Sequence, residues 1–376
     1  MNAITMKTST ASTITTASDQ WANRPNDERF TNLIDLHAFV DSERQRSKST
    51  VVSSRRLVAQ PDPQNPMRGL QIAGPNGNAA VPSNWAFGQL AAMAGVPAAY
   101  ARRIPAPLAA DCINYGLHHE RDIEDIGVLL TGQPDGLPEL RAATGPKYGR
   151  IWNSDITRKL VHKFGDGVTG DWKVPGEFGR EITVTKANTT LFASDRDMFV
   201  FLADEENRIE MPNRRNGKPG SLARGFFVWN SEVGDKTLGV AFFMFDYVCA
   251  NRIVWGAQGY TEYRLRHTVS APDRWLEDVE PILIEYSKAS ALPVQETIAA
   301  AQAKKIDKVE DFLRNRFSAR MSAQIMEAHV AAEGRPIETI WDATTGVTEF
   351  AKTIPHQDER IKLERAGGAI LDLVAV

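Results

Sequence analysis

The sequence predicts an α+β fold, with a largely antiparallel sheet and helices grouped at its N- and C-terminal sides. Helical periodicity governs residues 83–118, where apolar side chains recur every three or four positions. Short alternating apolar runs bounded by turn residues follow from residue 126, and helical patterns return after Pro272. This order of helices, strands and helices is typical of an α+β protein, whereas a parallel doubly wound sheet needs strands and helices in alternation.

The N-terminal third divides into a tail, a basic segment and a group of short helices. Residues 1–28 are rich in Thr, Ser and Ala and predict a disordered tail, because they cannot bury enough apolar surface to offset the entropy of ordering. A short helix over 30–42 precedes a basic segment, residues 44–68, that contains strand-like stretches. Ser83 caps the first of three compact helices, and Gly95 ends it.

Strand-like runs occupy the middle of the chain, and the strongest is an aromatic-rich hairpin. Its two strands, 226–230 and 237–245, are joined by a short polar turn. The other expected strands share the same alternation, and they are 128–130, 140–142, 181–185, 190–193, 198–202 and 260–267. We therefore expect one α+β domain over residues 29–290 and a helical C-terminal region over residues 291–376.

Composition excludes several classes of protein. The 376 residues carry 44 basic and 47 acidic side chains, a formal net charge of −3, which argues against a general polyanion binder but not against a local basic patch. With two cysteines, Cys112 and Cys249, a disulfide scaffold and a multi-cysteine zinc module are excluded. The apolar runs are too short to span a bilayer, and the N-terminus lacks the apolar region of a secretory signal. We expect a cytoplasmic protein with no membrane partner.

Three short motifs suggest cofactors or acid–base chemistry, and none has the context that this chemistry requires. Residues 165–170 (GDGVTG) match the dinucleotide pattern, but a helix precedes them where a strand is needed. The adjacent residues 118–120 (HHE) diverge and cannot simply chelate one metal ion. Asp195 and Asp197 predict a capped turn more than an acid–base pair. We therefore predict no cofactor, no metal and no assigned catalytic residue, so an enzyme is not the favoured interpretation.

A basic loop between two expected strands predicts contact with nucleic-acid phosphates. Long cationic side chains on a flexible backbone can follow a polyanion, whereas a solvated loop without a ligand is the alternative. The predicted phosphate-binding residues are Arg214, Arg215, Lys218 and Arg224, with Arg55 and Arg56 of the basic segment extending the same surface. Of the aromatic residues near these loops, including Tyr148 and Trp152, we expect some to be stacking platforms for bases and most to be core.

Several stretches, taken together in their order and spacing, resemble a known family. The stretches are 87–91 (FGQLA), 95–100 (GVPAAY), 141–150 (RAATGPKYGR), 230–231 (NS), 248–251 (VCAN), 266–268 (RHT) and 341–350 (WDATTGVTEF), with His356 and Arg360 after them. They make the chain similar to the phage/plasmid-like proteins, domain-of-unknown-function family 932. The resemblance implies a mobile-element origin and an α+β fold, and it implies no particular reaction.

Six residues of these stretches lie at the ends of three successive expected strands and form a candidate polar cluster. They are Asn230, Ser231, Cys249, Asn251, Arg266 and His267. Strand ends are where sites are built, but turns there also need Asn and Ser for backbone hydrogen bonds. We expect a structural polar network, with a binding site or a catalytic Cys249–His267 pair as the alternatives. Against catalysis, Cys249 follows an apolar strand and should be buried, and the neighbouring Arg266 disfavours the charged form of His267.

Together these patterns favour a DNA-binding protein of mobile-element replication or recombination, of the kind that binds or anneals single strands. The expected partners are single-stranded DNA and further copies of the chain in a homo-oligomer. Two other interpretations remain: a non-catalytic phage modulator of a host protein, and an enzyme with an unrecognised Cys/His site. A modulator would expose an apolar patch and would have no basic groove.

Overall fold

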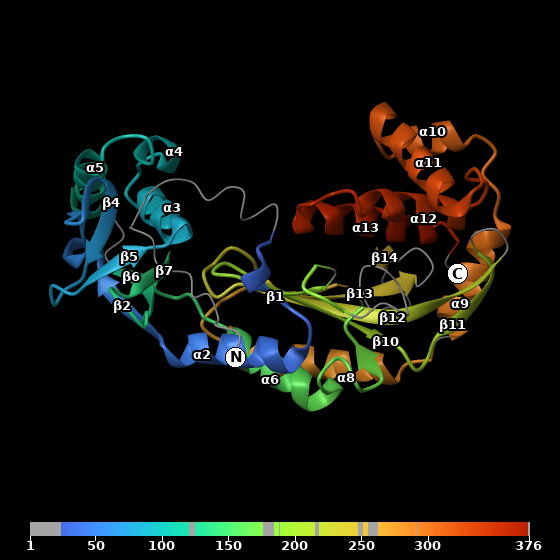
Figure 1. The fold of residues 1–376 in the computed structure, drawn as a ribbon, viewed down its shortest axis with the longest axis horizontal. Helices are drawn as coiled ribbons and strands as arrows, with labels where there is room; N and C mark the ends of the chain where they lie inside the picture. Colours follow the sequence, from blue (N-terminus) through green and yellow to red (C-terminus); the bar gives the residue numbers. More distant parts are fainter. Residues whose placement is uncertain are drawn as a thin grey trace.

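The predicted α+β class is confirmed by the computed structural model, which has two sheets with helices around them (Figure 1). It describes residues 24–119, 125–175, 184–187, 189–214, 218–246, 251–254, 262–290 and 292–374. A six-stranded sheet, here the first sheet, lies at one end of the molecule. A nine-stranded sheet, the second sheet, forms the centre of the remaining part.

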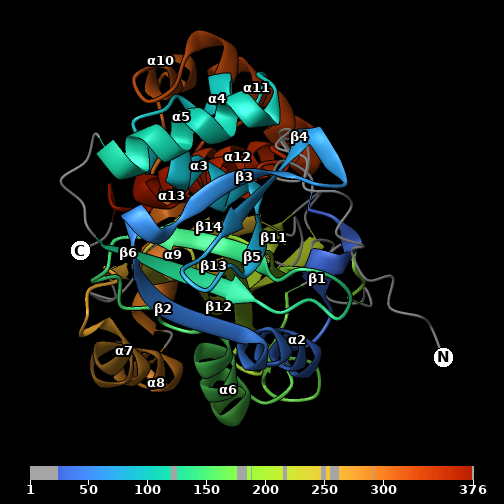
Figure 2. The same cartoon turned by 90° about the vertical axis from the view of Figure 1, so that its left-hand side faces the viewer.

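The first sheet is antiparallel except where β5 meets β7. In sheet order its strands are β2 (Ser47–Ser53), β6 (Asp125–Thr131), β7 (Glu139–Thr144), β5 (Ala79–Pro82), β4 (Asn65–Ala73) and β3 (Val58–Asp62), and a 3-10 turn, η2 (Ser54–Arg56), joins β2 to β3. Three helices cover it (Figure 2), and they are α3 (Asn84–Met93), α4 (Ala98–Ala101) and α5 (Ala106–His119). Ser83 caps α3 as predicted, because its hydroxyl accepts a hydrogen bond from the Ala86 amide at 3.1 Å.

The second sheet contains the predicted aromatic hairpin, formed by β12 and β13. Its main path is β1 (Arg29–Phe30), β9 (Leu191–Ala193), β10 (Met198–Asp204), β12 (Lys218–Asn230), β13 (Leu238–Asp246) and β14 (Asn251–Val254), with β8 (Trp172–Lys173) on β10, β11 (Ile209–Arg214) on β12 and β15 (Tyr263–Leu265) on β13. Trp229 lies opposite Gly239 in the hairpin, and a Cβ on Gly239 would be 1.9 Å from the Trp229 ring. Only glycine therefore leaves room for the indole to cross the neighbouring strand.

Side chains along β10, β12 and β13 alternate between two buried faces. One face, with Val200, Phe226 and Val240, packs on helices that lie below the sheet in Figure 1. These helices are α2 (Leu33–Gln45), α6 (Asn153–Phe164), α7 (Ala271–Arg274) and α8 (Glu280–Lys288), with a π-helical turn at Trp275–Val279. The other face carries the rings of Phe192, Phe199, Phe201, Phe227, Trp229, Phe243 and Phe245. Because both faces are covered, these strands are continuous apolar runs in the sequence.

The C-terminal helices share a core with the second sheet. They are α9 (Leu292–Ala303), α10 (Val309–Arg314), α11 (Ala319–Glu333), α12 (Ile340–Ala351) and α13 (Gln357–Leu371). Met211, Leu222 and Met244 of the sheet belong to the same buried cluster as Trp341 and Val347 of α12. Ile361 of α13 packs in the aromatic cluster on the upper face. The expected boundary near residue 290 therefore does not separate two cores.

The segment just before β1 is folded, although it falls inside the predicted tail of residues 1–28. Arg24 is 7% exposed, and its Nη1 lies 2.8 Å from Asp197 Oδ1. Asn26–Glu28 then forms a 3-10 turn. Residues 24–28 are thus wrongly placed in the tail, because a carboxylate at the start of β10 pairs with Arg24. Residues 1–23 lie outside the described residues.

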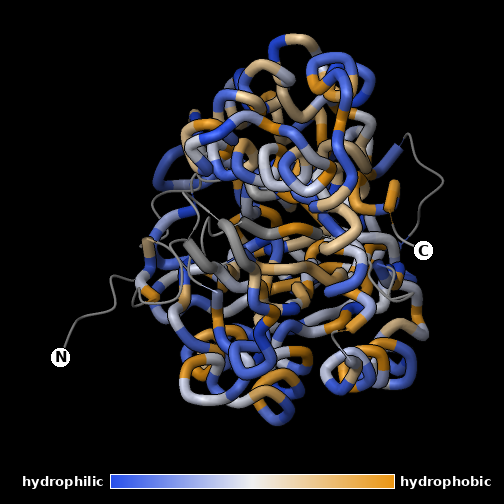
Figure 3. Tube along the Cα trace, turned by 90° about the vertical axis from the view of Figure 1, so that its right-hand side faces the viewer, coloured by the Kyte–Doolittle hydropathy of each residue, from blue (hydrophilic) through white to orange (hydrophobic). Residues whose placement is uncertain are grey.

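Hydrophobic residues gather along the strands at the centre of the molecule and on the inward sides of the helices (Figure 3). Among the helices that the structure describes, none has both the length and the apolar character needed to cross a bilayer.

Candidate functional site

The prediction that Arg224 contacts phosphate is wrong, because its side chain lies in the protein interior. Arg224 is 4% exposed, and its Nη2 lies 3.2 Å from Asp204 Oδ2 on the neighbouring strand β10. Its Nη1 donates to the carbonyl of Ala289, just after α8. A buried arginine whose donors face a carboxylate and a carbonyl holds elements together and does not reach a polyanion.

The other predicted phosphate-binding residues do not form one surface. Arg214 and Lys218 are register partners at the end of the β11–β12 pair, and Arg215 lies outside the described residues. Arg55 and Arg56 are exposed in η2, which follows β2 in the first sheet. Because β11 and β2 lie at opposite ends of the molecule (Figure 1), the prediction that Arg55 and Arg56 extend the same surface is wrong.

Among the described residues, the cations of the basic segment have no carboxylate partners. They are Arg44, Arg46, Lys48, Arg55, Arg56 and Arg68, all exposed except the half-buried Arg44. Across the part of the chain that the structure describes, none of the six takes part in an ion pair. The acid within the segment, Asp62, is itself buried and accepts a hydrogen bond from Gln71 at 3.0 Å. All of these cations but Arg68 follow one another along the end of α2, the edge strand β2 and η2, and we call these five the β2 stripe.

Asn230 and Ser231 of the candidate polar cluster form hydrogen bonds within the protein. Both are fully buried at the end of β12. The Asn230 amide donates to the Ile151 carbonyl at 2.9 Å and to Asn153 Oδ1 at 2.8 Å. The Ser231 hydroxyl donates to the Arg196 carbonyl at 2.6 Å and accepts from the Asp235 amide at 3.0 Å. This is the geometry of a structural network that fixes a turn.

That turn, residues 231–236, packs against α3 and the strands of the first sheet and so joins the two sheets. Trp85 and Gln89 of α3 donate to the Val233 carbonyl at 3.1 Å and 2.7 Å. The Tyr148 hydroxyl, from the loop after β7, donates to the Ser231 carbonyl at 2.8 Å. Val233 is completely buried. These contacts hold the hairpin turn in place between the two sheets. We call the turn, together with Trp85, Gln89 and the loop that contains Tyr148, the junction.

His267 packs on the same loop from the second sheet. Its Nδ1 lies 3.1 Å from the Gly149 carbonyl, and its ring stacks on Tyr148 with 4.8 Å between centroids. Burial, with a smaller contribution from the nearby charge of Arg150, lowers the pKa of His267 to about 4. The imidazole is thus neutral near pH 7 and held in place, which suits a structural role.

The remaining members of the polar cluster are Arg266, Asn251 and Cys249. Arg266 is exposed. Asn251 pairs in register with Asp246 in the β13–β14 pair. Cys249 lies outside the described residues, so its predicted burial and its pairing with His267 stay untested.

Arg141 in β7 is the centre of a buried ionic group that sequence reasoning missed. It is 2% exposed, and its Nη1 lies 3.3 Å from Glu232 Oε2 and 3.5 Å from Glu43 Oε2. Burial acts to lower the pKa of Arg141, but the two carboxylates outweigh it and raise the pKa. Burial raises the pKa of Glu43, which Arg141 opposes. The group connects α2, β7 and the hairpin turn.

Arg150, in the same loop as Tyr148, is buried without such a partner among the described residues. It is 7% exposed, and its Nε and Nη1 are buried with no hydrogen-bond acceptor in the described part of the chain. Its guanidinium carbon lies 5.3 Å from the Tyr148 ring centre and 5.8 Å from that of Trp152. Arg44 of the β2 stripe packs on the same Trp152 ring at 3.8 Å. Tyr148 thus packs against Arg150 and His267, and Trp152 packs against Arg44 and Arg150, while the presence of stacking platforms among the aromatic residues stays a prediction.

A second ionic group joins the junction to α13 and to the N-terminal segment. Lys236 Nζ lies 2.7 Å from Asp358 Oδ2 and 3.5 Å from Asp197 Oδ2. Asp197 also pairs with Arg24, and it closes a turn with Ser194, whose hydroxyl donates to Asp197 Oδ1 at 3.0 Å. The acid at 197 is therefore structural, in agreement with the expected turn.

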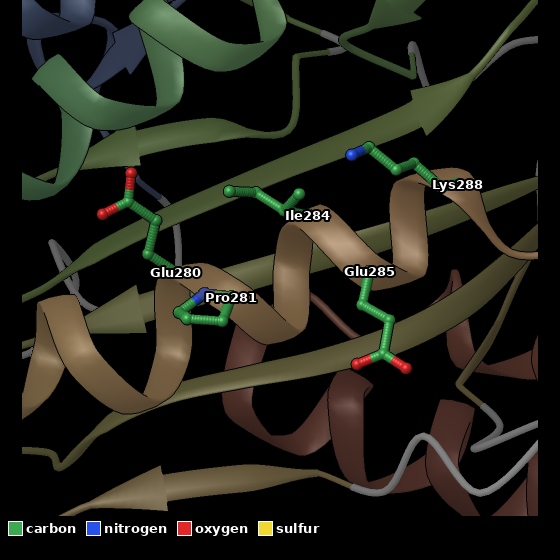
Figure 4. Close-up of a pocket in the computed structure, with 5 residues that line it drawn as sticks. All are labelled: Glu280, Pro281, Ile284, Glu285 and Lys288. Carbon is green, nitrogen blue, oxygen red and sulfur yellow. The ribbon is translucent and has the colours of Figure 1, made fainter.

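Two open hollows lie on the surface. One, of about 620 Å³, is lined by Lys147, His267, Thr268, Val269, Ser270 and Asp273 beside the junction. The other, of about 430 Å³, runs along α8, where Glu280, Ile284 and Lys288 project on one side and Glu285 on the other (Figure 4). Residues of mixed charge along a single helix do not converge on a ligand, so the α8 hollow is not a candidate site.

The glycine-rich motif at residues 165–170 lacks the context of a dinucleotide site. Gly165 ends α6 with a φ of +77°, and the short strand β8 follows the motif, so the loop does not open a helix for a pyrophosphate. Within the described ranges no three His, Cys, Asp or Glu residues gather as metal ligands. Comparisons with family models, curated proteins and solved structures found no match, so the similarity to the phage/plasmid-like proteins stays a prediction from sequence.

Proposed function

We propose that the protein binds single-stranded nucleic acid along the β2 stripe. The observation that carries the proposal is the absence of ion pairs from all five of its cations, in the part of the chain that is described. Cations without carboxylate partners create a locally positive field in a protein whose overall charge is −3. Phosphates can neutralise them and release counterions, which is the main source of affinity for a nucleic-acid backbone.

The arrangement of the stripe supports a single strand as the ligand. β2 is seven residues long, forms an edge of the first sheet and carries Lys48, and its length of roughly 20 Å separates Arg44 and Arg46 before it from Arg55 and Arg56 after it. An arrangement of this kind matches one phosphate backbone. Tyr148 already stacks on His267, and Trp152 already contacts Arg44. We therefore expect binding that depends on backbone charge and varies little with base sequence.

The setting of this activity follows from the resemblance in sequence. A mobile-element protein that binds single strands belongs in replication or recombination, where strands are protected or annealed, and homo-oligomers along the strand are part of this proposal. Arg214, Arg215 and Lys218 stay a prediction, as a second contact region apart from the β2 stripe, because Arg214 and Lys218 lie at the end of the β11–β12 pair.

The test is the affinity for single- and double-stranded oligonucleotides, measured by fluorescence anisotropy at several salt concentrations. Arg55→Ala with Arg56→Ala should weaken single-strand binding in every sequence tested. Arg314→Ala with Arg320→Ala, on the C-terminal helices, is the matched control because it removes the same charge from another surface. If both double variants bind as the parent does, or if they weaken equally, the β2 stripe is not the binding surface.

A further inference from the structure

Arg150 differs from the structural arginines of this protein in having no anion of the described chain within bonding distance. Arg141 faces a carboxylate oxygen at 3.3 Å and Arg224 faces one at 3.2 Å, although all three side chains are buried. The contacts of Arg150 are the rings of Tyr148 and Trp152. Cation–π attraction offsets only part of the cost of removing a guanidinium from water. A buried arginine of this kind points to an anion that the described part of the chain does not supply.

The charges around Arg150 increase its need for an anion. The carboxylate that acts on it most strongly is Glu232, but Oε1 of Glu232 accepts from the Asn153 amide at 2.7 Å and Oε2 faces Arg141. Arg141 and Arg44 both act on Arg150 with the same sign of charge. Burial and then these two cations lower the pKa of Arg150, against the opposing effects of Tyr148 and Glu232.

The location of Arg150 connects it to the β2 stripe. Arg44 is the first cation of the stripe, and it packs on the Trp152 ring that Arg150 also contacts. The order Arg44, Trp152, Arg150, Tyr148 therefore extends the stripe from the end of α2 into the junction. His267 stacks on Tyr148, and the two arginines contact Trp152, so both rings already have partners within the protein.

We propose that Arg150, together with Arg44, holds a phosphate group of the bound nucleic-acid strand at the junction end of the β2 stripe. The inference rests on the proposed function and names the contact at which the strand meets the junction. A guanidinium presents parallel N–H donors that match two phosphate oxygens, and such charge-assisted bonds are stronger than neutral ones. The phosphate oxygens would accept hydrogen bonds from Arg150 Nε and Nη1, which have no acceptor in the described part of the chain.

The experiment compares Arg150→Met with Arg158→Met, an exposed arginine on α6 that provides the same change of charge and shape nearby. Thermal unfolding is measured in inorganic phosphate and in chloride at equal ionic strength, and a single-stranded oligonucleotide is titrated against each protein. We expect phosphate to raise the unfolding temperature of the parent and of Arg158→Met but not of Arg150→Met. Oligonucleotide affinity should fall about 10–100-fold in Arg150→Met, the effect of removing hydrogen bonds to a charged group.

The outcomes separate this inference from the proposed function. In chloride, Arg150→Met should unfold at the same or a higher temperature than the parent, because it removes a buried charge without a partner. If Arg150→Met fails to fold, or if phosphate stabilises it as much as the parent or stabilises neither, the inference is wrong. If Arg150→Met loses the stabilisation by phosphate but binds the oligonucleotide as tightly as the parent, the site binds free phosphate and the contact with the strand is refuted. If the parent binds phosphate through Arg150 but binds no oligonucleotide, the anion site stands and the proposed function fails.

Discussion

Arginines around the second sheet have carboxylate partners, whereas the cations of the β2 stripe have none among the described residues. Around the second sheet, Arg24 pairs with Asp197, Arg224 with Asp204, and Arg365 with Glu262. Along the β2 stripe of the first sheet, the described structure offers no such pair. The junction between the sheets contains arginines of both kinds, such as Arg141 with two carboxylates and Arg150 with none among the described residues. Cations fixed by carboxylates hold elements together, whereas cations without them are available to a polyanion, and the predictions below test that distinction.

The largest effect is expected from Arg141→Met. It leaves Glu232 and Glu43 without their cation, so the free energy of unfolding should fall by about 3–5 kcal/mol. Urea unfolding measures the change. Adding Glu232→Gln to Arg141→Met should restore part of the stability, because one uncompensated carboxylate is removed. Equal stability of Arg141→Met and Arg150→Met would abolish the contrast between the two arginines.

Packing within the second sheet gives the next largest effect. The Cβ of Gly239→Ala would lie 1.9 Å from the Trp229 ring, so the hairpin must shift and stability should fall by about 1–3 kcal/mol. Gly145→Ala is the matched control, since a Cβ there has no atom of the described residues within 4 Å. Thermal unfolding of both variants measures the difference. Similar unfolding temperatures would show that the hairpin has room that this structure does not contain.

The pH dependence of stability tests the packing of His267. Its pKa of about 4 in the folded protein is below the value near 6.5 in the unfolded chain, so the unfolded chain binds more protons between these values. Stability from this group is complete above pH 6.5 and disappears as the pH falls toward 4, by at most about 1.4 kcal/mol per pH unit. His267→Asn should show a smaller decrease across that window in urea unfolding. Parallel pH profiles for parent and variant would contradict the buried, neutral imidazole.

The smallest change in stability is expected at the β2 stripe. Arg55→Ala with Arg56→Ala removes exposed cations that have no ion-pair partner in the described structure, so stability should stay within about 0.5 kcal/mol of the parent. The slope of log affinity against log salt for a single strand should fall by about 0.7 for each phosphate that the variant no longer neutralises. Differential scanning calorimetry and the anisotropy titrations measure the two effects. A large decrease in stability would place these arginines with the structural ones.

The sequence predicts the α3 cap and the aromatic hairpin correctly, because both depend on signals within a few residues of the chain. Ser83 caps α3, and β12 and β13 form the aromatic hairpin, since alternation and turn residues are local properties. The separation of the strands into two sheets was not predicted, because sheet membership depends on contacts between residues far apart in the chain. The contact of Val233 with α3 and with the strands of the first sheet is of this kind.

The candidate site was predicted less well, for the same reason. Arg224 has the sequence context of a basic loop, yet its burial depends on Asp204, twenty residues earlier. Nothing local distinguishes Arg141 from Arg150, since both lie in one short stretch and their difference is the presence of Glu232 and Glu43 beside Arg141. The basic segment was visible as a cluster of charge, but only the structure shows that its cations have no carboxylate partners among the described residues.

Arginine footprinting with a single-stranded oligonucleotide tests the central claim most directly. The protein is treated with an arginine-specific dicarbonyl reagent, with and without the oligonucleotide, and modification is read by mass spectrometry. We predict that the exposed arginines of the β2 stripe, Arg46, Arg55 and Arg56, become protected, while the exposed controls Arg314 and Arg320 stay as reactive as before. Protection that spares all three stripe arginines, or that is equal at the controls, would contradict the account.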